Sequence, residues 1–161
     1  MADTTILHFF CGKMAAGKST LARQIRNEQN AILLCEDEWL KQLYPQEITT
    51  IRDYVNYSDR LKSVIAPHVI ALLNLRVTVV MDFPANTVAQ RAWFRSLFEN
   101  SDVAHRLHYL DVSNKTCLEQ LHQRNKTLPE GAPLTSDATF DAITQHFQPP
   151  EEREGFHVIR Y

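Results

Sequence analysis

Short apolar runs alternate with longer amphipathic stretches along the whole chain. Five runs have the length and composition of buried strands: 5–11, 31–35, 77–82, 106–112 and 156–159. Between them, apolar residues recur at helical spacing, which predicts helices after Gly12, near Trp39, from Thr50, over 87–99, over 113–124 and over 139–147. Strands that alternate with helices favour a parallel sheet covered on both faces. We therefore predict a three-layer α/β fold with a five-stranded parallel sheet.

Two details of the predicted helices and loops are specific enough to be checked. Thr50 and Asp53 have the spacing of a capping box at the start of the longest helix. Pro67 lies inside that helix, and an internal proline removes a backbone hydrogen bond, so we expect a kink or a division there. Pro129 and Gly131 fall in the richest turn composition of the chain, which predicts a mobile lid loop at about 124–138.

Length and charge limit what the protein is. Its 161 residues fit one domain, 1–161. Lys and Arg total 17 against 19 Asp and Glu, a net charge of −2, so nucleic acid is an unlikely partner. No apolar run approaches the roughly 20 residues that span a bilayer, and Met1–Thr5 lacks a basic signal start. Three cysteines without zinc-ligand spacing indicate a reducing compartment, and we expect a cytoplasmic protein.

A glycine-containing turn, GKMAAGKST, stands between the first predicted strand and the first predicted helix. Its spacing is that of the phosphate-binding P-loop, in which backbone N–H groups and a helix N-terminus face a polyphosphate. With ordinary glycine usage the pattern arises by chance in well under ~1% of chains this long. The turn therefore predicts a nucleotide site made by Gly12, Lys13, Ala15, Ala16, Gly17, Lys18, Ser19 and Thr20.

The P-loop pattern also assigns roles to individual side chains. Lys18 is expected to reach the β- and γ-phosphates, and the Ser19 hydroxyl to bind Mg²⁺. Asp82 ends the third predicted strand, where a Walker B carboxylate holds Mg²⁺ directly or through water. A carboxylate that merely caps the following turn is the alternative for Asp82. Beside a P-loop, the metal role is the better interpretation.

Second signatures separate the classes of P-loop protein. A switch GTPase carries Asp-x-x-Gly and Asn-Lys-x-Asp, whereas this chain has Asp-Phe-Pro-Ala at 82–85 and Asn-Lys-Thr-Cys at 114–117. The first segment lacks the glycine of the GTPase motif, and the second lacks its final aspartate. A ring-forming ATPase normally needs a longer module with a helical lid domain. The length of this chain excludes most of that class.

The chain resembles the small P-loop kinases with a nucleoside-kinase type of fold, the group of polynucleotide 5′-kinase domains, zeta toxins and chloramphenicol phosphotransferase. Besides the P-loop, the similarity rests on the acidic segment 35–39, on 121–125, and on Asp82 followed by Asn86, Thr87 and Arg91. It implies ATP and Mg²⁺ as cofactors, adenine rather than guanine, and an acceptor pocket after the second strand.

The resemblance further implies roles for three side chains. Asp37 matches the carboxylate that orients the acceptor hydroxyl and takes its proton; a helix-capping role is the alternative, and Glu36 is the second choice as base. Arg124 matches a lid arginine that contacts donor phosphates, although a basic residue at a helix end also complements the dipole. Arg91 is expected to bind donor or acceptor phosphate, or else to be a solvated arginine.

Together these features predict an ATP-dependent kinase that phosphorylates a hydroxyl of a small molecule or nucleotide. Trp39, Tyr44, Tyr54 and Tyr57 line an organic acceptor on this hypothesis, or belong to the core. Two alternatives stay open. One is a kinase for nucleic-acid 5′-ends, which the acidic balance disfavours. The other is a nucleotide-binding regulatory protein with little turnover.

Overall fold

Five parallel strands form the centre of the structure, in the order β2-β3-β1-β4-β5. The computed structural model describes residues 4–161. Residues 1–3, which belong to the segment predicted to lack a basic signal start, lie outside the described residues. The strands are β1 (Ile6–Gly12), β2 (Ile32–Cys35), β3 (Val79–Pro84), β4 (Ala104–Leu110) and β5 (Val158–Arg160). All four neighbouring pairs are parallel, which confirms the predicted five-stranded parallel sheet.

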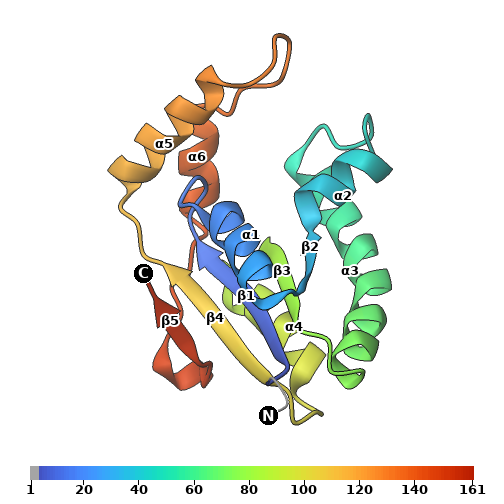
Figure 1. Cartoon of the computed structure of the whole chain (residues 1–161). Coiled ribbons are helices and arrows are strands. Elements are labelled where there is room, and N and C mark those ends of the chain that lie inside the picture. The colour runs from blue at the N-terminus through green and yellow to red at the C-terminus, as the bar shows by residue number, and fades with distance from the viewer. Residues whose placement is uncertain (1–3) are drawn as a thin grey trace.

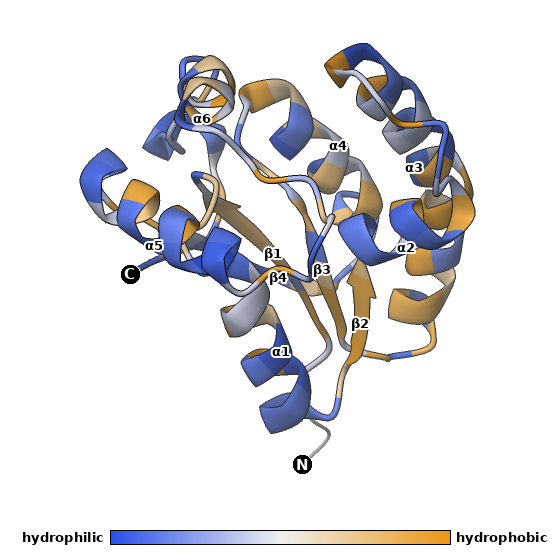
Figure 2. Ribbon diagram, turned by 90° about the horizontal axis from the view of Figure 1, so that it is seen from above, coloured by the Kyte–Doolittle hydropathy of each residue, from blue (hydrophilic) through white to orange (hydrophobic). Residues whose placement is uncertain are grey.

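Helices cover both faces of this sheet (Figure 1). They are α1 (Lys18–Gln29), α2 (Glu36–Leu43), α3 (Ile51–Asn74), α4 (Val88–Phe98), α5 (Asn114–Lys126) and α6 (Asp137–Thr144), with a short 3-10 helix at Glu152–Glu154. Seen from above the sheet edge, α1 and α5 lie on one side of the strands and α3 and α4 on the other (Figure 2). The predicted three-layer α/β arrangement is confirmed.

The central strand β1 shows why both faces need cover. Leu7 and Phe9 are fully buried against residues of α3 and α4, whereas Phe10 is fully buried with residues of α1, α5 and α6. Successive side chains of a strand point to opposite faces, so one apolar run supplies two cores. The carboxyl end of this strand leads directly into the glycine-containing turn.

Helix α3 differs from the sequence prediction at one residue. Thr50 and Asp53 form the expected capping box. Pro67 nevertheless lies inside a continuous 24-residue helix, so of the two predicted outcomes, a kink or a division, the division is wrong. Buried residues recur at helical spacing on both sides of the proline, among them Ile65 and Val69, and this packing against the sheet keeps the two halves in one element.

The segment predicted as a lid is bounded by helix at both ends. Helix α5 continues to Lys126, and α6 begins at Asp137, two residues earlier than expected, because the Ser136 side chain accepts a hydrogen bond from the backbone N–H of Thr139. The Asn125 Nδ2 donates to the Thr135 carbonyl at 2.8 Å and closes the base of the loop. Only the turn between these residues is without regular structure.

The three cysteines are free and buried in the core. Burial raises the pKa of the Cys11 thiol, and that of Cys35, to about 11. They therefore behave as small apolar side chains. Within residues 4–161, none of the helices combines the length and apolar composition that would cross a bilayer.

Candidate nucleotide site

The P-loop turn is shaped by close approach of the backbone. Gly17 precedes α1 with φ 104°, a conformation that favours glycine, and Ala15 also has a positive φ of 63°. A Cβ on Gly12 would stand 3.2 Å from the Leu110 carbonyl oxygen of the neighbouring strand β4. No side chain caps the N-terminus of α1, so its first N–H groups have no side-chain cap to accept from them. This is the arrangement in which a helix N-terminus binds phosphate.

Lys18 lies inside this turn. Its Nζ donates to the carbonyl oxygens of Gly12 and, at 2.9 Å, of Lys13. Burial lowers the pKa of the Lys18 ammonium, and the nearby Asp82 carboxylate acts in the opposite direction. The ammonium is therefore held at the mouth of the loop, in reach of any phosphate bound there.

Ser19 and Asp82 meet although 63 residues separate them in the chain. The Ser19 Oγ donates to Asp82 Oδ2 at 2.7 Å, and the Cys35 thiol is 3.7 Å from the same oxygen. A hydroxyl and a carboxylate supply hard oxygen ligands, which Mg²⁺ prefers together with water and substrate phosphates. Among residues 4–161, no group of three or more His, Cys, Asp and Glu is placed to hold a metal by itself. Ser19 and Asp82 fit a Mg²⁺ ion whose remaining ligands come from a bound nucleotide.

Comparison with known families agrees with this geometry. A family described as "AAA domain" matches residues 7–150, which run from β1 past α6. The chain belongs to this AAA-domain family. No curated protein matches it in sequence.

Solved structures with a similar fold include kinases. The chain superposes with a TM-score of 0.72 on a putative kinase from Chloroflexus aurantiacus j-10-fl, at 15% identity, covering 100% of this chain and 86% of that one. A sugar kinase from Janibacter sp. HTCC2649 gives 0.65 at 15% identity, with 99% and 85% covered. The Mycobacterium tuberculosis APS kinase CysC, in complex with AMPPNP and APS, gives 0.60 at 16% identity, with 99% and 90% covered. Likeness at this identity concerns the fold, and it confirms the predicted P-loop kinase fold.

Arg124, the predicted lid arginine, belongs to α5. Arg124 is exposed in the last turn of α5, and its charge lowers the pKa of Lys18 slightly, after burial as the main cause. The guanidinium is thus near enough to the P-loop lysine to act on it electrostatically. Figure 1 shows α5 and its loop on the opposite side of the P-loop from α2 and α3.

The two acidic residues at the start of α2 have different surroundings. Asp37 is exposed and pairs with Lys41 one helical turn later, at 2.9 Å. Glu36 is buried, with one oxygen accepting from the Tyr54 hydroxyl and the other from Ser58 Oγ at 2.7 Å. Burial raises the pKa of the Glu36 carboxyl. Asp37, Glu36 and Tyr54 were all candidate site residues from the sequence, but nothing in the sequence indicated that α3 encloses Glu36.

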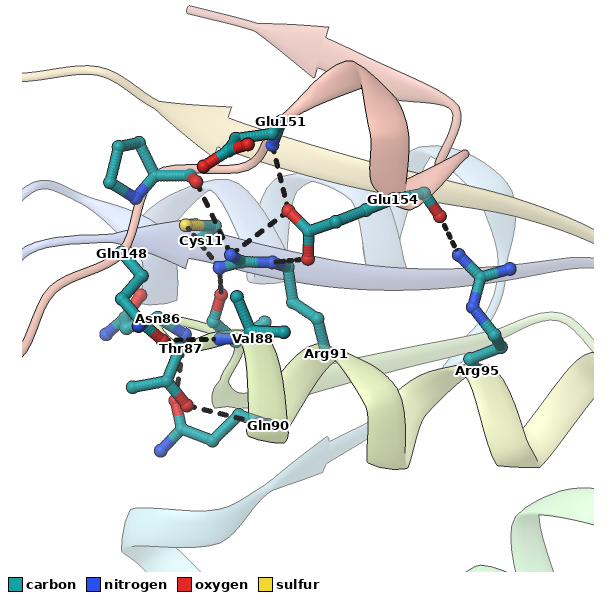
Figure 3. Close-up of polar contacts among 12 residues, drawn as sticks. Cys11, Asn86, Thr87, Val88, Gln90, Arg91, Arg95, Gln148, Glu151 and Glu154 are labelled. Carbon is teal, nitrogen blue, oxygen red and sulfur yellow. Dashed lines mark hydrogen bonds and ion pairs between the residues drawn. The ribbon is translucent and has the colours of Figure 1, made fainter.

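Asn86 connects the P-loop to two other segments, a role that the sequence did not reveal. Figure 3 shows Asn86 near Gln90 and Gln148 of those segments. Its Oδ1 accepts from the Gly12 N–H at 2.9 Å, and its own N–H donates to Gln90 Oε1 at 2.8 Å. Its carbonyl accepts from the Gln148 N–H at 2.8 Å. One asparagine therefore ties the first P-loop glycine to α4 and to the C-terminal segment.

Arg91 does not lie where a phosphate ligand would have to be. It is fully buried, and Figure 3 shows its guanidinium enclosed by the C-terminal segment. Its five N–H groups all have acceptors: both carboxylate oxygens of Glu154, the carbonyls of Ala85 and Pro149, and the sulfur of Cys11. No donor is left for a ligand. The structure thus corrects both expectations for Arg91, phosphate binding and solvation, because tertiary contacts enclose it.

Proposed function

We propose that the protein is an ATP-dependent kinase that transfers the γ-phosphoryl group to a hydroxyl of a small molecule or nucleotide. The observation that carries this proposal is the 2.7 Å hydrogen bond between Ser19 and Asp82 beside the half-buried Lys18. A bound Mg²⁺, held by Ser19 and Asp82, would neutralise phosphate charge. The P-loop N–H groups and Lys18 bind and orient the phosphates.

The proposed step is an in-line displacement. The acceptor oxygen forms a bond to the γ-phosphorus while the bond from that phosphorus to the β,γ-bridging oxygen breaks, and ADP leaves with the electron pair. The acceptor proton passes to a carboxylate at the start of α2, for which Asp37 is the solvent-accessible candidate. Arg124 stabilises the charge on the transferred group.

The structural relatives support this assignment. A sugar kinase and an APS kinase bound to AMPPNP and APS share nearly the whole fold. The P-loop at the end of β1 of this chain provides the same class of nucleotide site.

Mg²⁺-dependent ADP release in the presence of an acceptor panel tests the proposal. Lys18→Ala should lower ADP release at least 100-fold, because it removes the cation that faces the phosphates. Lys115→Ala, an exposed lysine on α5, is the matched control and should change nothing. Equal rates for Lys18→Ala and the unaltered protein would contradict the kinase assignment.

A nucleotide-binding protein with little turnover is the second candidate. The ion pair between Asp37 and Lys41 favours it, because the carboxylate of the candidate base contacts a lysine of its own helix. Calorimetry separates the two: tight ATP binding with negligible turnover for every acceptor supports the regulatory function. Asp37→Asn tests the base directly, since unchanged acceptor-dependent turnover would exclude Asp37.

The thiols also bear on location. We propose a cytoplasmic protein because all three cysteines are free and buried, as suits a reducing compartment. Cell fractionation of the tagged protein tests this, and recovery from a secreted fraction would contradict it.

A further inference from the structure

A cavity of about 300 Å³ lies between α3 and α4. Helix α3 contributes Tyr54, Val55, Ser58, Asp59 and Lys62, and α4 contributes Ala89, Gln90 and Trp93. A larger hollow, of about 470 Å³, is lined only by residues of α2 between Glu38 and Leu43 and so has a single wall. The smaller cavity has two walls from different elements, which a binding site requires.

This cavity is joined to the nucleotide site on two sides. On one side, Gln90 accepts from the Asn86 N–H, and Asn86 in turn binds the P-loop Gly12. On the other, Ser58 binds Glu36 at 2.7 Å, and the adjacent Cys35 contacts the Asp82 carboxylate. The cavity therefore opens along the same carboxyl edge of the sheet as the P-loop, where Figure 2 shows α3 and α4 side by side. In open α/β sheets ligands bind along this edge.

The charges that line the cavity cancel. Asp59 is exposed on α3, and Lys62 follows it by three residues on the same helix. A strongly anionic ligand would meet the Asp59 carboxylate, and a cationic ligand would meet the Lys62 ammonium. Glu36 is buried and does not line the cavity, and its two oxygens accept hydrogen bonds from Tyr54 and Ser58. A neutral ligand meets neither repulsion.

The polar groups of the cavity are mixed donors and acceptors beside an aromatic wall. Asp59 only accepts hydrogen bonds, Lys62 only donates them, and the Gln90 amide has two N–H donors while its oxygen serves Asn86. The Lys62 Nζ stands 5.2 Å from the centre of the Trp93 ring, so a charged donor adjoins an apolar face. Hydroxyl groups both donate and accept, and the C–H face of a ring or polyol packs on an aromatic side chain.

We propose that this cavity is the acceptor site and that it takes a neutral polyhydroxylated compound of monosaccharide size. The assignment as acceptor site rests on the proposed kinase function. A volume of about 300 Å³ is at the small end of ligand pockets and excludes an oligonucleotide from being enclosed. Asp59, Lys62 and Gln90 bind the hydroxyl groups, and Trp93 packs against the carbon skeleton.

Tryptophan fluorescence tests binding without any need for phosphoryl transfer. The chain has two tryptophans, so Trp39→Phe leaves Trp93 as the only reporter. The probes are glucose, ribitol and myo-inositol as neutral polyols, gluconate and ribose 5-phosphate as anions, and a single-stranded oligonucleotide. At least one neutral polyol should shift Trp93 emission saturably, at least tenfold more tightly than either anion. The Trp93→Phe variant, which retains Trp39, should show no such shift.

Matched variants then locate the ligand. Asp59→Asn should weaken binding of the responding polyol at least tenfold, whereas Asp141→Asn, the same change at an exposed position on α6, should leave it unchanged. No saturable response to any polyol, tighter binding of an anion or of the oligonucleotide, or equal affinities in the two variants would overturn the inference. Because the readout is binding, these outcomes are separate from the Lys18→Ala test of ADP release.

Discussion

Ser19 and Asp82 illustrate what a single pair of side chains contributes to this protein. Replacing Ser19 by Ala removes the hydroxyl that donates to Asp82 at 2.7 Å and that fits a magnesium ligand. We expect the affinity for ATP to fall at least tenfold in the presence of Mg²⁺, which corresponds to about 1.4 kcal/mol. Without Mg²⁺ the affinity should be unchanged, because the P-loop N–H groups remain. Calorimetric titration with and without Mg²⁺ measures both.

Ser63→Ala is the control for this change. Ser63 is exposed on α3, and its hydroxyl donates only to the Arg60 carbonyl of its own helix. The Ser63→Ala variant should bind ATP like the unaltered protein, both with and without Mg²⁺. An equal loss of affinity for Ser19→Ala with and without Mg²⁺ would show that the hydroxyl acts on the loop rather than on the metal.

At the scale of elements, the ion pair between Arg91 and Glu154 joins α4 to the C-terminal segment. Arg91 is fully buried and the Glu154 side chain nearly so, and their atoms approach to 2.8 Å. Glu154→Ala leaves a buried guanidinium without its counter-charge, so unfolding free energy should fall by about 3 kcal/mol or more. Urea denaturation followed by circular dichroism measures this loss.

The same segment offers a matched exposed pair. Arg153 and Glu151 are separated by 2.7 Å, and both side chains are mostly in solvent. Arg153→Ala should therefore cost less than about 1 kcal/mol. If the two variants unfold at the same urea concentration, the Arg91 contact does not fasten the C-terminal segment to α4.

Across the whole molecule, a buried chain of hydrogen bonds links distant parts of the sequence. His8 on β1 and His108 on β4 are both buried, with 2.9 Å between His8 Nδ1 and His108 Nε2. His8 Nε2 donates to the Gln29 oxygen, so its Nδ1 accepts from His108, whose Nδ1 in turn accepts from the Tyr161 hydroxyl. Every ring nitrogen has a partner while both rings are neutral.

The hydrogen bonds of His8 and His108 predict that the protein loses stability in acid. Burial, with a smaller contribution from Arg106, lowers the pKa of His8, and burial together with His8 and Arg106 lowers that of His108 to about 4. Between about pH 6.5 and 4 the unfolded chain therefore binds more protons than the folded one. For His108 alone the free energy of unfolding should fall by on the order of 1–2 kcal/mol from pH 7 to pH 5.

Urea denaturation at these two pH values measures the effect. His108→Gln should reduce the difference between pH 7 and pH 5, since the amide does not titrate. His68→Gln, an exposed position on α3, should leave the difference as it is. A difference that His108→Gln does not change would contradict the proposed origin of the acid sensitivity.

Local patterns predicted most of the fold and the nucleotide half of the site. The alternation on β1, the capping box at Thr50 and the P-loop spacing each act over a few residues, so they are legible in the chain. The possible division at Pro67 and the role of Arg91 were predicted wrongly because both depend on what packs around these residues. Nothing near Arg91 in sequence indicates Glu154, which is 63 residues away.

The sequence by itself determined the order of strands and helices and the phosphate-binding turn, because hydrophobic periodicity and backbone conformation are set by neighbouring residues. Tertiary structure alone decided that Arg91 pairs with Glu154, that Glu36 is enclosed by α3, and that a cavity opens beside Trp93. These features join segments far apart in the chain. Their chemistry depends on distance and burial, which exist only once the layers have packed.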